Sequence, residues 1–216
     1  QSPQKERVSR LSNLKFTMTN KHCPMNIQTT VVIPCFNEAL GVKKTLSEIF
    51  HVFGDKKDFE VIAVDDGSSD ETLTTLQEIA SKTPALRVLE NKTNKGYGAS
   101  LKKGILIAKG NFIVITDADG TYPATFIPQL LERAKECQMA VGSRTGKNVN
   151  IPLLRRPAKW VLLKYARWMA KADIKDLNSG LRVFRKKDAL PFFPLLPQGF
   201  SFTTTITLAM HANEME

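Results

Sequence analysis

Residues 29–53 read TTVVIPCFNEALGVKKTLSEIFHVF, a short β-branched run followed by a stretch with helical periodicity. The run at 29–33 favours a buried strand, and we expect Pro34 to end it. From 39 to 53 the apolar residues recur on one face, as in an amphipathic helix. The stretch therefore predicts a strand that a short polar loop joins to a helix, which is the first half of a βαβ unit.

The same alternation repeats along the chain. Further strands are predicted at 59–64, 86–90, 111–116 and 138–141, and further helices at 70–80, 99–109 and 124–137. We expect Ser69 or Asp70 to cap the first of these helices. Strands and helices at this spacing predict an α/β fold with a mostly parallel sheet that helices cover on both faces. Such sheets place ligands beyond the carboxyl ends of their strands, so the chemistry is expected in those loops.

The composition is that of an ordinary globular protein. Of the 216 residues, 42% are hydrophobic and 24% are charged, which excludes collagen-like, disulfide-scaffold and fully disordered chains. We expect one domain at 27–216, preceded by a basic, flexible arm at 1–26. The three cysteines lack CxxC spacing and form no cluster with the three histidines, so we expect a reducing compartment and no zinc.

The formal net charge of +10 is concentrated in two segments. Residues 1–26 carry a net +4 and residues 147–175 a net +7, which leaves −1 for the remainder. Nucleic acid or an anionic membrane would explain such segments. No apolar run approaches the length of a membrane span and the start lacks a secretion signal, so we expect a chain that neither crosses a membrane nor is exported as written.

Two acids follow the apolar run of the segment IVITDADG at 113–120. Asp117 and Asp119 can share one Mg²⁺ or Mn²⁺ ion and leave coordination positions for water and a diphosphate. The alternative is a helix cap or a solvated loop, since turns rich in Asp are common.

Two further loops carry polar groups at the ends of strands. In VIAVDDGSSD at 61–70, Asp66 can accept hydrogen bonds from a nucleobase or from ribose hydroxyls. In PCFNE at 34–38, Phe36 can flank a base and Glu38 can bind a hydroxyl. Neither loop decides the function by itself.

Read together with NKGYG at 94–98, these loops resemble the nucleotide-sugar half of glycosyltransferase family 2, which has the GT-A fold. In that family the first loop reads Pro-x-Tyr/Phe-Asn-Glu, the second reads Asp-Asp-Gly-Ser-x-Asp, and the third contains Asp-x-Asp. All three occur here in that order. VGSR at 141–144, the basic stretch that follows, and DLNSGLRVF at 176–184 resemble the branch that includes dolichol-phosphate mannose synthase and the bacterial polyprenyl-phosphate glycosyltransferases. The resemblance extends from residue 28 to about residue 210.

The resemblance implies a metal-dependent hexosyltransferase that moves a sugar from a nucleoside diphosphate sugar to dolichyl or undecaprenyl phosphate, with inversion. It implies that the donor nucleotide is bound by Pro34, Phe36, Asn37, Glu38, Asp65, Asp66, Lys95, Gly96, Asp117 and Ala118. It implies that the acceptor phosphate is bound by Arg144, Arg155, Arg156, Ser179 and Arg182. Asp119 and Asp176 are then catalytic, and Asp117 and Asp119 hold Mg²⁺ or Mn²⁺.

The segment 151–171 combines cations with apolar and aromatic side chains, which suits a phosphate headgroup on a lipid. Trp160, Tyr165 and Trp168 are residue types favoured at membrane interfaces. The alternative is an amphipathic core helix with a solvated basic face. Together with the resemblance, the segment predicts peripheral association with the anionic cytoplasmic face of a membrane, and no nucleic-acid partner.

Two features depart from the pattern of that branch. Dolichol-phosphate mannose synthases commonly read Asp-Ala-Asp-Leu-Gln where this chain has DADGT at 117–121, so Thr121 or water would replace the Gln that can complete metal coordination. The relatives also continue beyond the position of Glu216, often into membrane-spanning helices, and we expect this chain to be a truncation.

Three other functions fit part of the pattern. A family 2 transferase that acts on a glycan hydroxyl would need a general base, and NSGLR at 178–182 with the basic stretch before it argues against that acceptor. A basic nucleic-acid-binding module leaves the acidic loops unexplained, because they would repel phosphate in the absence of a metal. A sugar nucleotidylyltransferase would need an early Gly-rich, Arg-containing loop, which the sequence lacks.

Overall fold

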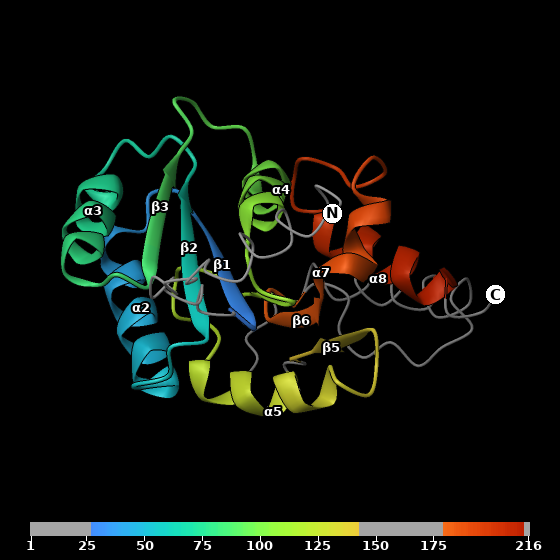
Figure 1. Ribbon diagram of the computed structural model, residues 1–216. Coiled ribbons are helices and arrows are strands. Elements are labelled where there is room, and N and C mark those ends of the chain that lie inside the picture. The colour runs from blue at the N-terminus through green and yellow to red at the C-terminus, as the bar shows by residue number, and fades with distance from the viewer. Residues whose placement is uncertain (1–26, 143–178, 214–216) are drawn as a thin grey trace, which may run out of the picture.

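The computed structural model describes residues 27–142 and 179–213, which form a six-stranded sheet flanked by helices (Figure 1). The strands are β1 (Thr29–Cys35), β2 (Phe59–Asp65), β3 (Leu86–Glu90), β4 (Phe112–Ile115), β5 (Met139–Val141) and β6 (Arg182–Arg185). Their order is β3-β2-β1-β4-β6-β5. The first four are parallel, whereas β6 runs antiparallel to both of its neighbours. The sheet is thus mixed and mostly parallel, as the sequence predicts.

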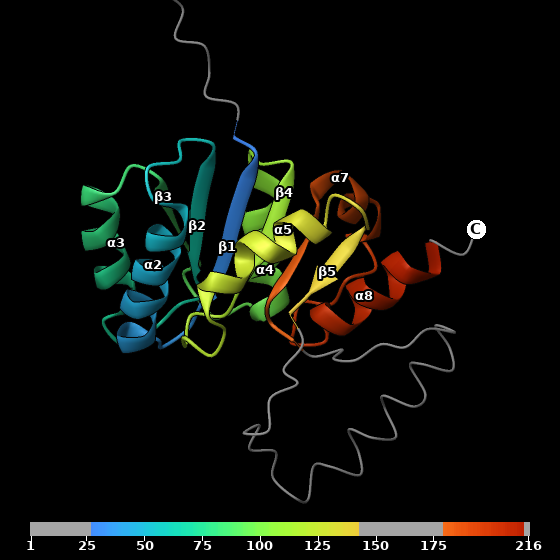
Figure 2. The same cartoon turned by 90° about the horizontal axis from the view of Figure 1, so that it is seen from below.

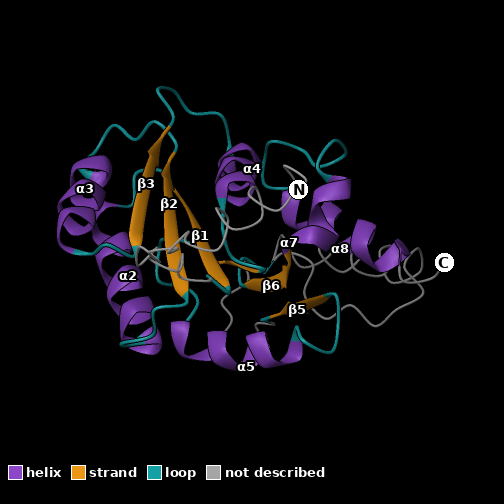
Figure 3. Ribbon diagram, in the orientation of Figure 1, coloured by secondary structure: helices purple, strands orange, loops and turns teal. Residues whose placement is uncertain are grey.

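Helices cover both faces of the sheet (Figure 2, Figure 3). One face packs against α2 (Ala39–Phe53), α3 (Thr72–Lys82) and α5 (Ile127–Arg133). The other packs against α4 (Tyr97–Ile107), α7 (Lys186–Ala189) and α8 (Phe202–Asn213). Two short 3₁₀ helices, η1 (Ala124–Phe126) and η3 (Leu190–Phe192), precede α5 and follow α7. Among the described helices, none has the length and apolarity that crossing a bilayer requires.

The central strands are apolar on both faces because each face meets a separate core. Val31 and Ile33 of β1 belong to the core beneath α2, whereas Val32 belongs to the core beneath α4. All three side chains are fully buried. A parallel strand covered on both sides reads as a continuous apolar run, which is why the sequence at 29–33 lacks alternation.

The first strand continues through Pro34, where the sequence predicts its end. Pro34 pairs with Val64 of β2, but the pairing of β1 with β4 ends at Val32 and Ile115. Proline has no backbone N–H, so it is tolerated where no neighbouring strand needs that donor. Strand β4 has already ended beside Pro34, so no pairing with β4 is lost there. The pairing of β1 with β2 continues through Pro34.

The helix predicted at 70–80 begins two residues later, at Thr72, and Ser69 does not cap it. Asp70 accepts a hydrogen bond from the backbone N–H of Thr72 at 3.0 Å, which satisfies a donor of the first turn. The Thr72 hydroxyl also donates to Asp70, and this bond, together with the backbone hydrogen bonds, holds the pKa of Asp70 below its usual value. Ser69 instead donates its backbone N–H to Asn37 Oδ1 at 2.8 Å, and this contact joins the loops after β1 and β2.

Two other helices also differ from their predicted bounds. Helix α4 begins at Tyr97, two residues earlier than predicted, because the positive φ of 99° at Gly96 turns the chain directly into the helix. Helix α5 ends at Arg133 and not at Cys137. The backbone N–H groups of Lys135 and Glu136 bond three residues back, to the carbonyls of Glu132 and Arg133, so the chain tightens into turns.

Candidate functional site

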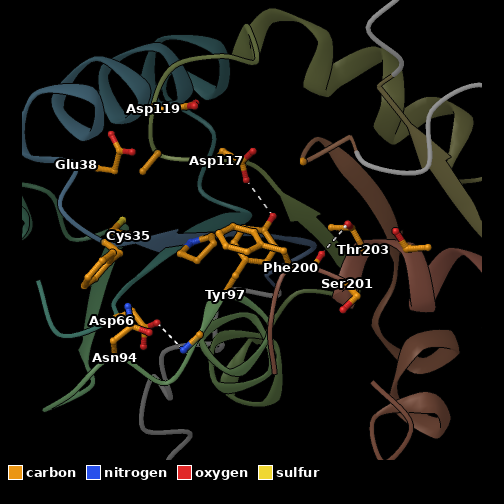
Figure 4. A pocket seen from close by; sticks show the side chains of 16 residues that line it. Cys35, Glu38, Asp66, Asn94, Tyr97, Asp117, Asp119, Phe200, Ser201 and Thr203 are labelled. Carbon is orange, nitrogen blue, oxygen red and sulfur yellow. Dashed lines mark hydrogen bonds between the residues drawn. The ribbon is translucent and has the colours of Figure 1, made fainter. Parts of the chain in front are cut away.

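A pocket of about 860 Å³ lies at the carboxyl ends of β1, β2 and β4 (Figure 4). Parallel sheets bind ligands at this edge, which is where the sequence predicts the site. The residues on its wall that were predicted to bind the donor nucleotide are Pro34, Phe36, Glu38, Asp66, Gly96, Asp117 and Ala118. Asp119, predicted as a catalytic residue and metal ligand, lines it too. The fold therefore brings the three acidic or aromatic loops to one cavity.

The loop after β4 presents its two acids differently. Asp117 is half-buried, and its Oδ1 accepts a hydrogen bond from the Tyr97 hydroxyl at 2.9 Å. Asp119 is exposed, and its Oδ1 accepts from the backbone N–H of Thr121 at 2.8 Å. Between them, the carbonyl of Ala118 accepts from the Thr45 hydroxyl at 2.9 Å, which fixes this loop to α2. The loop is thus anchored to α2 while both carboxylates line the pocket.

Negative charge gathers on this side of the pocket. Burial raises the pKa of Glu38, and the nearby carboxylates of Asp119, Asp70 and Asp117 raise it further. A cation bound here would relieve that repulsion. In the described part of the chain, no three His, Cys, Asp or Glu side chains are close enough to hold a metal ion by themselves. Asp117 and Asp119 nevertheless fit Mg²⁺ or Mn²⁺, because these ions take carboxylate oxygens and fill further positions with water and phosphate oxygens.

Asp66 organises the loop that forms another wall of the pocket. The side chain is 3% exposed, and its Oδ1 accepts from Asn91 Nδ2 at 2.7 Å and from the backbone N–H of Lys95 at 3.0 Å. Its Oδ2 accepts from the backbone N–H of Gly96 at 2.8 Å. Three donors thus already engage this carboxylate, and they pull residues 95 and 96 toward the end of β2.

Asp65, the preceding acid, points elsewhere and does not line the pocket. Its Oδ2 accepts from the backbone N–H groups of Gly67 and Ser68, each at 3.2 Å, and stabilises the turn after β2. Among the described residues, its buried Oδ1 has no hydrogen-bond partner. Burial, assisted by the charges of Asp65 and Glu38, raises the pKa of the neighbouring Cys35 thiol. Cys35 therefore contributes a neutral thiol to the pocket wall.

Asn37 and Lys95, also predicted in the donor site, are not on the pocket wall. Asn37 adopts a left-handed φ of 56°, and its side-chain oxygen accepts from Ser69. Lys95 contributes its backbone N–H to Asp66. Both residues shape the loops that carry the pocket, which is a role that their motifs do not distinguish from contact with a ligand.

Ser179 and Arg182, predicted to bind the acceptor phosphate, are fully buried. The guanidinium of Arg182 donates to the Ser179 carbonyl at 2.8 Å and to the Thr207 hydroxyl, which joins β6 to α8. The Ser179 hydroxyl donates to the carbonyl of Gly142, next to β5. Neither residue lines the pocket, so this placement supports a structural role and does not favour direct contact with a phosphate.

The remaining predicted residues fall outside the residues that the structure describes. They are Arg144, Arg155, Arg156 and Asp176. The two basic segments, 1–26 and 147–175, fall outside as well. The acceptor contacts assigned to them from the sequence stay predictions.

Half of the pocket wall was not predicted. Its additional residues are Cys35, Asn94, Tyr97, Gly180, Phe200, Ser201, Thr203 and Thr204. Asn94 and Tyr97 lie in the NKGYG motif, which did mark this loop. The last four come from the chain at the start of α8, where a run of hydroxyl residues is the sole signal in the sequence.

Tyr97 is the most tightly integrated of these additional residues. Burial raises the pKa of its hydroxyl, and the charge of Asp117 together with the hydrogen bond to it raises the pKa further. The hydroxyl is therefore a stable donor to that carboxylate. On its other side, the ring stacks on Phe200 with the centroids 5.4 Å apart and the planes 23° from parallel.

The chain is similar in sequence to several transferases that act on lipid phosphates. It is 31% identical over 188 residues to a dolichol-phosphate mannosyltransferase of Pyrococcus furiosus, a match that covers 84% of this chain and 53% of the relative. It is 28% identical over 195 residues to a dolichyl-phosphate beta-glucosyltransferase of Dictyostelium discoideum, covering 82% of this chain and 60% of the relative. An undecaprenyl-phosphate mannosyltransferase of Micrococcus luteus is 28% identical over 189 residues, covering 84% and 76%. The chain thus spans about half to three quarters of the length of these relatives.

Solved structures show the same fold. Glucosyl-3-phosphoglycerate synthase of Mycobacterium tuberculosis, in complex with Mn²⁺, uridine diphosphate and glucosyl-3-phosphoglycerate, gives a TM-score of 0.67 at 19% identity, covering 86% of this chain and 66% of that one. Mannosyltransferase PcManGT of Pyrobaculum calidifontis, in complex with GDP-Man and Mn²⁺, gives 0.55 at 23% identity, covering 76% and 46%. The similarity confirms the predicted GT-A fold. Residues 30–190 match the model described as Glycosyl transferase family 2, and the chain belongs to that family.

Proposed function

We propose that this glycosyltransferase moves a sugar from a nucleoside diphosphate sugar to the phosphate of a polyprenyl lipid, either dolichyl or undecaprenyl. The donor half of the proposal is carried by the pocket, in which Asp117, Asp119 and the loop held by Asp66 line one cavity. The acceptor half is supported by relatives of about 30% identity, whose names specify dolichyl or undecaprenyl phosphate.

The nucleoside is proposed to bind between the aromatic and the acidic walls of the pocket. Phe36 is 46% exposed, so its ring is free to flank a base. Asp66 would act mainly by shaping the loop at 94–96, because its oxygens already accept three hydrogen bonds. Pro34 and Glu38 would complete this side, with Glu38 accepting from a hydroxyl of the donor.

Asp117 and Asp119 are proposed to hold Mg²⁺ or Mn²⁺, which when bound neutralises charge on the departing diphosphate. Asp119 is exposed at the pocket and hence accessible to such an ion, whereas Asp117 is oriented by the hydrogen bond from Tyr97. The carboxylates concentrated around Glu38 provide the charge that attracts a cation to this point.

The proposed acceptor supplies its own nucleophile. With a second pKa of about 6, a phosphate monoester is largely dianionic at pH 7 and needs little help from a base. One phosphate oxygen would form a bond to the anomeric carbon as the bond to the diphosphate breaks, which inverts that centre. Asp176 would then orient the acceptor, and Arg144, Arg155 and Arg156 would bind its phosphate through forked hydrogen bonds.

The basic segment at 147–175 is proposed to bring the chain to the anionic cytoplasmic face of a membrane. Its net charge of +7 includes Arg155 and Arg156, and each cation near such a surface contributes about 1 kcal/mol of binding. The donor would then reach the pocket from the water and the lipid acceptor would reach it from the membrane.

A transfer assay tests the proposal directly. The full chain is incubated with MnCl₂ and radiolabelled UDP-glucose or GDP-mannose, in the presence of dolichyl or undecaprenyl phosphate. We expect label in an organic extract only when a lipid phosphate is present. Label that instead reaches a glycan hydroxyl, or water alone, would contradict the proposed acceptor.

Asp119→Ala tests the metal assignment. We expect the variant to lose Mn²⁺-dependent binding of the nucleoside diphosphate in calorimetry while it retains its melting temperature, because Asp119 is an exposed loop residue. Asp55→Ala, which removes an exposed acid near the far end of α2, is the control. An unchanged Mn²⁺-dependent affinity in Asp119→Ala would refute the assignment.

Reversing the charges of Arg155 and Arg156 tests the acceptor side. Flotation with anionic vesicles should show weaker binding, while titration with soluble donor should be unchanged.

Asp176→Asn should lower kcat and leave donor affinity nearly unaltered. An Asp176→Asn variant that is destabilised yet fully active would remove this residue from the catalytic set.

A further inference from the structure

The half-buried side chain of Tyr97 connects two parts of the pocket that lie far apart in the sequence. It is the first residue of α4, and its hydroxyl donates to Asp117 Oδ1 at 2.9 Å (Figure 4). The ring of Tyr97 also stacks on the ring of Phe200. Tyr97 therefore bridges the loop after β4 and the chain that enters α8.

The carboxylate of Asp117 has little freedom beside this hydroxyl. A Cβ atom at Gly180 would lie 2.6 Å from Asp117 Cγ and 2.7 Å from Oδ1. Such separations are too short for real Cβ atoms, so the backbone before β6 already touches the carboxylate. Asp117 is thus confined by a backbone on one side and by a tyrosine hydroxyl on the other.

The stacking partner of Tyr97 is held in place by its own backbone. Ala99 donates its N–H to the carbonyl of Gln198 at 2.9 Å, which fixes the segment before Phe200 to the first turn of α4. At Gly98, a Cβ atom would meet the carbonyl carbon of Gln198 at 2.9 Å, so this close approach requires glycine. Phe200 itself is 82% exposed. A ring this exposed gains little free energy from burial, so we expect it to contribute through its contact with Tyr97.

We propose that Tyr97 is a positioning residue, whose hydroxyl fixes the Asp117 carboxylate for donor and metal binding and whose ring is held by Phe200. The inference rests on the proposed function of the pocket. Packing alone would not require tyrosine here, because phenylalanine would fill the same space and stack equally well. The hydroxyl contributes the charge-assisted hydrogen bond to Asp117, and such bonds are among the stronger ones in proteins.

Tyr97→Phe removes the hydroxyl and keeps the ring. Binding of UDP and of GDP by the full chain is measured by calorimetry with and without MnCl₂, alongside the melting temperature. We expect Mn²⁺-dependent affinity to fall about tenfold, the loss typical of a hydrogen bond to a charged group. Affinity without Mn²⁺ should change much less, a split that a merely structural role would not produce.

The matched control is Thr30→Val, which removes a buried hydroxyl that donates to Glu60 at 2.9 Å near the amino ends of the strands. It should lower the melting temperature and leave nucleotide affinity unchanged. If wild type binds neither UDP nor GDP, the proposed function fails and the inference fails with it. If wild type binds and Tyr97→Phe binds equally well, the inference alone is overturned.

A double-mutant cycle tests the role of Phe200. If Phe200 acts by holding Tyr97, then Phe200→Leu weakens Mn²⁺-dependent binding in wild type but has little further effect in the Tyr97→Phe background. If Phe200 contacts the nucleotide by itself, the two losses multiply. The second result would remove Phe200 from the positioning arrangement.

Discussion

Gly180→Ala should damage the donor site without damaging the fold. The new methyl group would lie 2.6 Å from Asp117 Cγ, where at least 3.0 Å is needed. The carboxylate must therefore retreat by about 0.4 Å at Cγ, which pushes it toward the Tyr97 hydroxyl on its other side and distorts the geometry between the two groups. The 2.9 Å hydrogen bond from Tyr97 would be lost or strongly weakened.

The expected loss of affinity follows from two effects of the substitution, the loss of a hydrogen bond and the displacement of a carboxylate. Loss of a hydrogen bond to a charged group costs about 1.5–3 kcal/mol, and a displacement on the order of 1 Å in a site can cost about a hundredfold in activity. We therefore expect nucleoside diphosphate affinity in the presence of Mn²⁺ to fall by about ten- to a hundredfold. Alanine at a position without a left-handed φ gains about 0.4–1 kcal/mol, which offsets part of that cost, so the variant should stay folded with a modestly lower melting temperature.

Calorimetry and thermal melting on one preparation give both quantities. The matched control is Gly199→Ala, since a Cβ atom there meets nothing within 4 Å and the backbone is again not left-handed. It should bind as wild type does. If Gly180→Ala also bound UDP or GDP with wild-type affinity, the confinement of Asp117 would have no bearing on the donor site.

Three further substitutions separate charge, loop shape and stability. Since the pKa of Glu38 is raised on folding, Glu38→Gln should raise the melting temperature above that pKa, and the gain should vanish as the pH falls below it; a uniform shift at all pH values would contradict this. Asp66→Asn should weaken the hydrogen bonds from the backbone N–H groups of Lys95 and Gly96, which hold their loop to Asp66, and should lower nucleotide affinity at least tenfold in calorimetry. Unchanged affinity would count against the role of Asp66 in shaping the pocket. Glu60→Gln, which disturbs a half-buried contact with Arg87 at 3.1 Å, should lower the free energy of unfolding by about 1 kcal/mol in urea titration, and any accompanying loss of nucleotide binding would be unexpected.

The regular elements that the sequence predicts well are those whose signal is local. Helix α2 and strand β3 have the bounds that their periodicity indicates, and the parallel strands follow from the alternation alone. Strand β6 was not predicted. Its place between β4 and β5 depends on partners about 40 to 70 residues away, which no local pattern reveals.

The site shows the same division between local and distant information. The motifs identified the three loops, but they could not separate Asp65 from Asp66, because consecutive residues at a strand end point in opposite directions. Nor could they show that the Arg182 guanidinium is buried, since its partner Thr207 lies on another element. Tyr97 was inside a recognised motif, yet its role appears only once Asp117 is placed beside it.

The position of β6 between β4 and β5 also bears on how the chain folds. Strand β5 stands at the edge of the described sheet beside β6, which follows it by about 40 residues. During synthesis β5 leaves the ribosome well before β6, so it cannot yet pair with that strand. Strands β1 to β4 can already associate at that time, because shorter connections join them. Pairings between residues so far apart in the sequence form late, and this one places Gly180 against the carboxylate of Asp117. Competence to bind a ligand would thus be acquired late, and hydrogen exchange should find β5 and β6 the least protected strands.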